Sequence, residues 1–206
     1  MTEIFIPSVK KDLQELFKGA IEIDIRTGYW TVEVWDQILG EVSRGVRIRL
    51  IVGMLKKKVD GKDASVDLGN PQEVFQSLII SSKFSKASEA VLVDIANRIH
   101  HKKLEIRGHS DVHGAMYMGK KRFRRHRAFA GSVNFTWPPQ NNRGNVWFEV
   151  RRAKTNRNLA KLFENDWGCC TDVSSLILEK IKNEVTNWKP PKLSLIKRLI
   201  QWLFRK

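Results

Sequence analysis

The sequence has only two cysteines, Cys169 and Cys170, and they are adjacent. Neighbouring cysteines rarely bridge each other and no second pair exists, which excludes a disulfide framework and a zinc knuckle. The first 19 residues lack a basic segment followed by a long apolar one, so no signal peptide is expected. No apolar run approaches the roughly 20 residues that a membrane span needs. Together these absences predict a cytoplasmic protein.

Acidic residues are also scarce, with 22 Asp and Glu against 37 Lys and Arg, a net charge of +15. Such a charge attracts polyanions, because binding releases their condensed counterions. Nucleic acid is therefore the first partner to expect and an anionic membrane surface the second. An excess of charge that serves solubility alone stays open as the third explanation.

A chain of 206 residues can form one α/β domain and a tail. Residues 21–31 predict a strand ending at Gly28, 32–45 a helix and 46–55 a strand, which together form a βαβ unit with a parallel strand pair. Residues 56–70 predict a surface loop. Further strands are expected within 104–110, 111–118, 128–135 and 145–153, and further helices from Asn70 and across 86–100, 158–166 and 173–188. The domain is expected to cover 1–188, with a basic amphipathic helix over 189–206.

The most informative residues lie between Val112 and Phe135. A strand with His113 is followed by a densely basic run and then by a strand ending in Gly131, Ser132 and Asn134. Alternate residues of a strand share a face, so His113 and position 115 point the same way. A histidine can attack a phosphodiester as a nucleophile while a cation and uncharged donors stabilise the phosphoryl oxygens. A core histidine on a strand face is the structural alternative.

This pattern resembles the phospholipase D superfamily, in which His-x-Lys is followed one hairpin later by Gly-Ser-x-Asn. Over roughly residues 20–155 the chain is similar to phospholipase D-type restriction endonuclease domains, through RTGYWT and VRIRLIVGML as well as the motif. The resemblance implies an α/β fold with a mixed, largely parallel sheet and helices on both faces.

The same resemblance implies hydrolysis of DNA without a metal or other cofactor, through a phosphohistidine at His113. Because the chain has a single copy of the motif, it implies a homodimer in which the His113 residues of two subunits meet. By analogy with the family, the chain would be the nuclease of a restriction or antiviral defence system, with a helicase or other ATPase as partner.

The chain departs from the family pattern at three positions. Ala115 stands where the family has its lysine, Lys120 where it has an aspartate, and Gly144 where it has a glutamate; Glu149 is the nearest carboxylate that could orient the histidine. Losing one charged stabiliser typically costs on the order of 10²–10³ in rate, so the chain as written is expected to be nearly inactive. Either it is naturally inactive, or the lysine of an active enzyme has been replaced; the intact flanking pattern HG-x-MY favours replacement.

The basic run between the motif strands contains no acid, which favours contact with a phosphate backbone close to the site. It consists of Lys120, Lys121, Arg122, Arg124, Arg125 and Arg127. Tyr29 and Thr27 follow a core strand at its carboxyl end, where open α/β sheets form their sites, and Tyr29 is a further candidate for nucleic-acid contact.

Three other functions fit parts of the sequence. HSDVH at 109–113 could hold a metal, although adjacent strand positions rarely converge on one ion. The tail from Leu195 to Phe204 could lie on a membrane and make the chain a phospholipid-cleaving phosphodiesterase, or could dock on its own domain. Lipid-cleaving members of the family that the chain resembles usually carry two motifs in a larger chain, so the resemblance argues against a membrane partner. Ala115 is the best support for the third function, a non-catalytic nucleic-acid-binding module.

Overall fold

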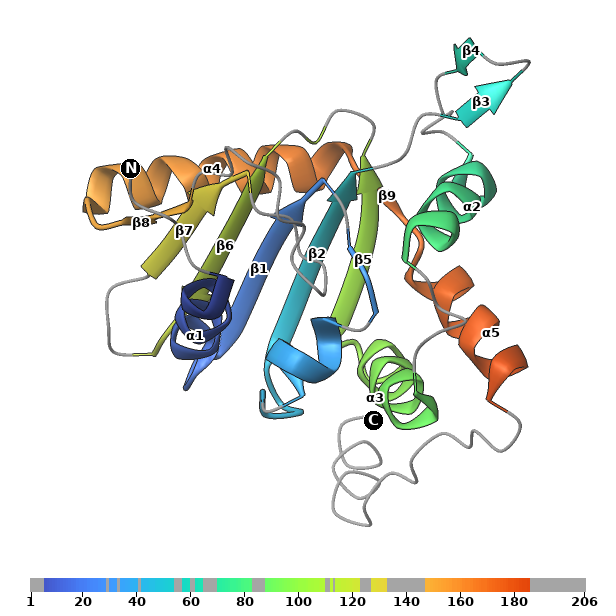
Figure 1. Cartoon of the computed structure of the whole chain (residues 1–206), viewed down its shortest axis with the longest axis horizontal. Helices are drawn as coiled ribbons and strands as arrows, with labels where there is room; N and C mark the ends of the chain where they lie inside the picture. The colour runs from blue at the N-terminus through green and yellow to red at the C-terminus, as the bar shows by residue number, and fades with distance from the viewer. Residues whose placement is uncertain are drawn as a thin grey trace, which may run out of the picture.

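A seven-stranded sheet forms the centre of the molecule, in the order β8-β7-β6-β1-β2-β5-β9 (Figure 1). The computed structural model describes residues 6–28, 30–32, 34–40, 42–53, 57–59, 62–64, 70–82, 88–109, 112, 114–122, 127–132 and 147–185. The strands of the sheet are β1 (Glu22–Thr27), β2 (Arg47–Gly53), β5 (Leu104–His109), β6 (Ala115–Lys120), β7 (Arg127–Gly131), β8 (Trp147–Val150) and β9 (Thr171–Asp172). The strands β3 (Lys57–Val59) and β4 (Lys62–Ala64) form a separate antiparallel pair.

In the described part of the chain, five α-helices and one short π-helix accompany the sheet. They are α1 (Ile6–Phe17), η1 (Trp35–Leu39), α2 (Pro71–Ser82), α3 (Glu89–His100), α4 (Ala153–Cys169) and α5 (Ser174–Glu184). Two of them begin at capping residues that satisfy free backbone donors. The Asn70 side chain accepts hydrogen bonds from the first turn of α2, and the Ser88 hydroxyl accepts one from Val91 in α3. The helix expected to open at Asn70 is confirmed.

The sheet is mixed, as expected. β1, β2 and β5 are parallel neighbours, which confirms the predicted βαβ unit. The expectation of a largely parallel sheet is wrong for the described strands, because β6, β7, β8 and β9 all pair antiparallel to their neighbours. β6 and β7 are joined by a short hairpin, and a hairpin connection forces antiparallel pairing.

Helices cover both faces of the sheet, which confirms that part of the predicted fold (Figure 1). One face, here called the α1 face, buries apolar residues of α1, η1, α2, α3 and α5 together with Ile23, Ile25 and Leu50. The opposite α4 face buries Phe163 and Trp167 of α4 against Ile51 and Met118. The two faces therefore have separate cores.

Several element boundaries differ from the sequence-based expectations. The helix expected over 32–45 is the short η1, α4 is longer than the expected 158–166, and α1 was not predicted. The strands β3 and β4 lie in the expected loop at 56–70. The expected helix at 189–206 lies outside the described residues.

Gly119 of β6 allows α1 to approach the sheet closely. A Cβ atom at this position would lie 2.5 Å from the carbonyl oxygen of Leu16, at the end of α1. That distance is far below van der Waals contact, so any side chain here would displace the helix. The fully buried Leu16 and Phe17 show that this end of α1 lies in the core.

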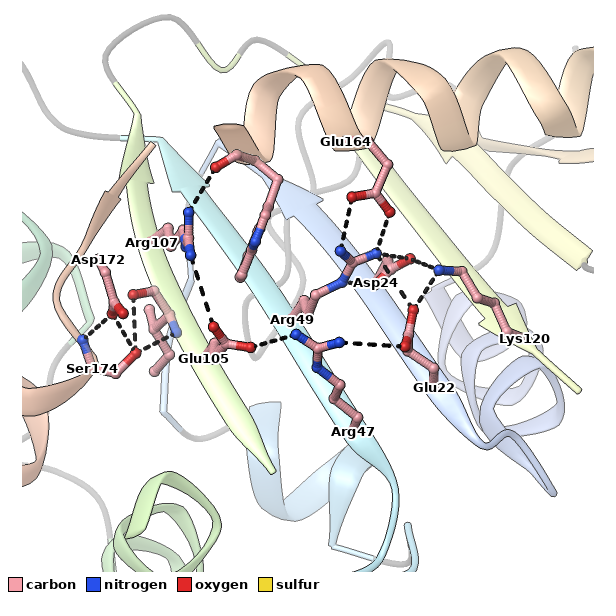
Figure 2. Close-up of polar contacts among 12 residues, drawn as sticks. Glu22, Asp24, Arg47, Arg49, Glu105, Arg107, Lys120, Glu164, Asp172 and Ser174 are labelled. Atoms are coloured by element: carbon pink, nitrogen blue, oxygen red, sulfur yellow. Dashed lines mark hydrogen bonds and ion pairs between the residues drawn. The ribbon is translucent and has the colours of Figure 1, made fainter. Parts of the chain in front are cut away.

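α4 is held to its face of the sheet by a network of charged side chains (Figure 2). Arg49 of β2 lies at its centre, with 6% of its side chain exposed. Its guanidinium donates to Asp24 at 2.7 and 2.9 Å and to Glu164 of α4 at 2.7 and 3.0 Å. It also lies over the rings of Phe163 and Trp167, with its central carbon 4.8 and 5.3 Å from their centroids. Burial by itself lowers the pKa of Arg49, but the hydrogen bonds to Glu164 and Asp24 outweigh that effect and raise it.

The network extends on both sides of Arg49 (Figure 2). The ammonium group of Lys120 binds Glu22 and lies 3.0 Å from Asp24. On the other side, Arg107 donates to the carbonyl of Trp167 at 2.9 Å and stacks on its ring at 4.2 Å. Opposite charges thus face each other across neighbouring strands, which allows charged residues to be covered by a helix.

Candidate active site

The two halves of the sequence motif meet at one edge of the sheet. Ala115, the first residue of β6, pairs with Gly131, the last residue of β7. Gly114 precedes Ala115 and Ser132 follows Gly131, so these four residues lie together; we call them the motif edge. β1, β2 and β5 end at the same edge, because β6 runs antiparallel to β1. This is where open α/β sheets bind ligands.

Gly114 adopts a backbone conformation that favours glycine. Its φ of 82° lies in the left-handed region, and a Cβ atom would lie 3.3 Å from the carbonyl oxygen of Gly131. Both features bring the chain that leads into β6 close to the end of β7. The local backbone geometry at Gly114 therefore sets how closely the two motif halves approach each other.

Beneath the motif edge, two residues of β6 lie in the apolar core of the α1 face. Ala115 is 5% exposed and Tyr117 is fully buried, both within the α1-face core. The Tyr117 hydroxyl and the Thr27 side chain form a hydrogen bond. Burial raises the pKa of Tyr117 well above its usual value, so this phenol is neutral at physiological pH. Tyr117 therefore provides a rigid, uncharged support under position 115.

Several predicted site residues fall outside the described part of the chain. These are Tyr29, His113, Arg124, Arg125 and Asn134. Ser132 is described and exposed at the motif edge. The structure therefore places the backbone on both sides of the motif, while the roles predicted for His113 and Asn134 stay predictions.

The sequence suggested that the basic run lies near the site. In the structure, its described residues lie away from the motif edge. Gly119 pairs with Arg127 at the opposite end of the hairpin from Ala115 and Gly131. We call this the hairpin end. Since a strand rises about 3.3 Å per residue, the hairpin end lies roughly 15 Å from the motif edge. The expected proximity is wrong for Lys120, Lys121, Arg122 and Arg127, because an antiparallel hairpin carries its turn away from the far ends of its strands.

Two of these basic residues are paired with carboxylates. Burial alone lowers the pKa of Lys120, but its contacts with Glu22 and Asp24 outweigh this and raise that pKa. Arg127 binds Glu149 at 2.7 Å. Both cations therefore balance the charge of carboxylates within the domain.

Glu149 lies on β8, opposite Phe129 and two residues from the pair formed by Gly131 and Trp147. Its carboxylate accepts hydrogen bonds from Arg127 at 2.8 Å and Arg151 at 3.1 Å. The hydrogen bond from Arg127 is the main reason why the pKa of Glu149 is lowered, with a further contribution from Arg151. Glu149 is therefore an ionised partner of two arginines, and its predicted role toward His113 stays a prediction.

Arg26 lies beside the motif edge and is a residue that sequence reasoning missed. Its Nε lies 2.6 Å from Asp166 of α4, and one terminal nitrogen lies 3.5 Å from the Gly114 carbonyl oxygen. Arg26 thereby links α4 to the residue that precedes β6. The available signal was a single arginine next to Thr27, at the end of a strand in which charged and apolar residues alternate.

The carboxyl end of α4 also carries the two cysteines. Cys169 is exposed, whereas Cys170 is largely buried beside the α4-face core. Burial, together with the negative charge of Asp166, raises the pKa of Cys170 to about 12. Among the described residues, no group of His, Cys, Asp and Glu is arranged to hold a metal ion. Ser110, Asp111 and His113 of the HSDVH segment lie outside that part.

Comparison with known proteins gives the family but no curated relative. No curated protein matches the chain. Among solved structures, NucT from Helicobacter pylori is 13% identical with a TM-score of 0.47, covering 81% of this chain and 92% of its own. TrmBL2, an archaeal chromatin protein with a novel mode of DNA binding, is 15% identical with a TM-score of 0.45, covering 84% of this chain and 56% of its own.

In the described part of the chain, no helix is long and apolar enough to cross a membrane. Residues 13–167 match the family model described as "Cardiolipin synthase, PLD-like domain". This range includes the motif edge, β1 to β8 and most of α4. The chain therefore belongs to this family of phospholipase D-like domains.

Proposed function

We propose that the chain is a metal-independent endonuclease domain that hydrolyses DNA phosphodiester bonds at the motif edge. The observation that carries this proposal is the pairing of Ala115 with Gly131, which sets the two motif halves side by side on neighbouring strands. In this proposal His113 precedes Gly114 as the nucleophile, and Ser132 and Asn134 supply hydrogen-bond donors from the adjoining strand.

The reaction has two steps. An imidazole nitrogen of His113 attacks phosphorus, the bond to the leaving oxygen breaks, and a phosphohistidine forms. His113 of the partner subunit gives its proton to the leaving oxygen and then accepts one from the water that hydrolyses the phosphohistidine. A lysine at position 115 would stabilise the charge that develops on the phosphoryl oxygens, and Ala115 leaves this charge without that stabiliser. Since the motif occurs once per chain, the site needs a homodimer.

We further propose that the domain spans 1–188, acts in the cytoplasm and belongs to a restriction or defence system in which a helicase or other ATPase delivers the DNA. The net charge of +15 supports a polyanionic substrate. The family assignment supports phosphodiester chemistry.

Restoring the lysine tests the reaction. The Ala115→Lys protein should cleave DNA about 10²–10³ times faster than the chain as printed, with and without a chelator. The matched control is Ala115→Lys combined with His113→Ala, which should abolish cleavage and the phosphorylated intermediate while leaving the fold intact. A folded Ala115→Lys protein that cleaves no DNA would refute the nuclease proposal.

A non-catalytic DNA-binding domain is the second candidate. It is favoured by the burial of Ala115, which is 5% exposed within the α1-face core. If this candidate is correct, Ala115→Lys lowers stability, restores no cleavage and leaves DNA affinity unchanged. The same variant thus separates the two functions.

A further inference from the structure

The charges along α4 run against the preference of a helix. Its amino-terminal half carries Lys154, Arg157 and Lys161 without an acidic residue, whereas Glu164 and Asp166 lie in the other half. The helix dipole is positive at the amino end and acts mainly within the first and last turns, so Lys154 near the start and Asp166 near the end are unfavourable. Glu164 and Asp166 are explained by their bonds to Arg49 and Arg26. The three cations have no such explanation within the domain.

Lys154, Arg157 and Lys161 occur at intervals of three and four residues, so they share one side of the helix. We call them the α4 basic face. All three are exposed, and none forms an ion pair with another described residue. They extend over about 10 Å of helix at 1.5 Å per residue. Arg151 and Arg152, both exposed, extend the positive charge beyond the start of α4.

A cavity of about 660 Å³ adjoins this face, between the amino-terminal half of α4 and strands β6, β7 and β8. Met118 and Val150 contribute to its apolar lining. Lys120, Arg127, Arg151 and Arg157 supply four cations, of which Lys120 is bound by Glu22 and Asp24. Among the described residues that line the cavity, Glu149 is the one acid, and it binds Arg127 and Arg151. The cavity lies at the hairpin end, so it is separate from the motif edge.

From these observations we propose that the α4 basic face and the adjoining cavity bind the phosphate backbone of nucleic acid, outside the catalytic site. A membrane surface fits less well, because an interfacial helix needs an exposed apolar side. The large apolar residues Phe163 and Trp167 of α4 are buried against the sheet, and Leu162 is the one large apolar residue that α4 exposes. A polyanion would also offset the unfavourable charges at the amino end of α4.

The proposal deepens the proposed function by giving it a length requirement. The hairpin end lies roughly 15 Å from the motif edge, which corresponds to about four or five nucleotides at 3.4 Å each along a duplex strand. A DNA that reaches both places must therefore be longer than this. Shorter substrates would contact one place alone.

The test measures DNA binding by the full chain as printed, using fluorescence anisotropy with a 20-nucleotide single strand over a range of salt concentrations. The test variant is Lys154→Gln, Arg157→Gln and Lys161→Gln together. Its affinity for the 20-mer should fall roughly 10²-fold near 0.1 M salt, and the slope of log affinity against log salt should fall by about 2. Its thermal stability should be unchanged or higher, since the helix dipole is relieved.

The matched control removes the same charge elsewhere, through Arg44→Gln, Lys102→Gln and Lys180→Gln. These residues lie near α3 and α5, away from α4. The control should lose no more than a few-fold in affinity. Equal losses in both variants would show that net charge alone binds DNA and would overturn the proposal. So would a test variant that keeps its DNA affinity but loses binding to phosphatidylglycerol vesicles.

Failure of this proposal and failure of the proposed function are distinguishable. The binding measurements use Ala115 protein and need no catalysis, so they are unaffected if Ala115→Lys restores no cleavage. Conversely, cleavage by the lysine-restored protein would stand if the α4 basic face proved irrelevant to binding.

Discussion

Replacing Arg49 by methionine should strongly destabilise the domain. Arg49 is buried between two carboxylates and two aromatic rings, and its loss leaves Asp24, which is 1% exposed, with Lys120 as its remaining cationic contact. Removing one partner of a buried ion pair typically costs about 3–5 kcal/mol, because the other charge stays buried without compensation. For a chain of this size, that loss lowers the melting temperature by roughly 10 °C.

Thermal and urea unfolding followed by circular dichroism would measure this effect. Arg47→Met is the matched control, because Arg47 lies on the same strand with 46% of its side chain exposed and binds Glu105 at 2.8 Å. An exposed ion pair of this kind contributes about 1 kcal/mol or less. Combining Arg49→Met with Asp24→Leu should recover part of the loss, because the uncompensated charge is removed. If Arg49→Met costs no more than Arg47→Met, the network of charged side chains around Arg49 does not hold α4 to the sheet.

Three further predictions follow from individual contacts. Gly119→Ala should cost about 1–3 kcal/mol by pushing α1 from the sheet, whereas Gly168→Ala, which meets no atom within 4 Å, should be neutral or stabilise by up to about 1 kcal/mol in urea unfolding. In the lysine-restored protein, Arg26→Gln should slow DNA cleavage about 10- to 100-fold without weakening DNA binding, and Arg26→Lys should recover part of the rate. If Arg26→Gln and Arg26→Lys lose the same stability and neither changes the rate, the role of Arg26 is purely structural. The hydrogen bond from Arg49 is the main reason why the pKa of Glu164 is lowered. The stabilisation that this bond gives the folded protein is therefore present at neutral pH and disappears as the pH falls below the usual glutamate value of about 4.5. Urea unfolding at pH 7 and pH 4 should therefore differ less in Arg49→Met than in the unmodified chain.

The sequence predicted the centre of the fold well, because its strands carry strong alternating or apolar patterns. It could not predict that α4 covers the charged side of β1 and β2. Alternating charges such as Asp24 and Arg49 indicate a polar face, but whether that face meets water or opposite charges depends on partners more than 20 residues away. The periodic segment at 32–45 predicted a full helix, whereas the described helix is limited to Trp35–Leu39.

Nearness in sequence was misleading at the candidate site. The basic residues between the motif strands were expected near the site, but the hairpin carries them to its other end. Arg26 comes from a strand almost 90 residues before the motif and still reaches Gly114. Contacts of this kind depend on strand order, which local patterns do not contain.

The two adjacent, free cysteines give the domain one convenient position for a chemical label. Maleimide reagents react with thiolates, and Cys170, with its pKa near 12, has almost none at neutral pH. Cys169 is exposed at the end of α4, three residues after Asp166, which binds Arg26 beside the motif edge. A fluorophore attached there would report on DNA arriving at that edge without any substitution in the chain.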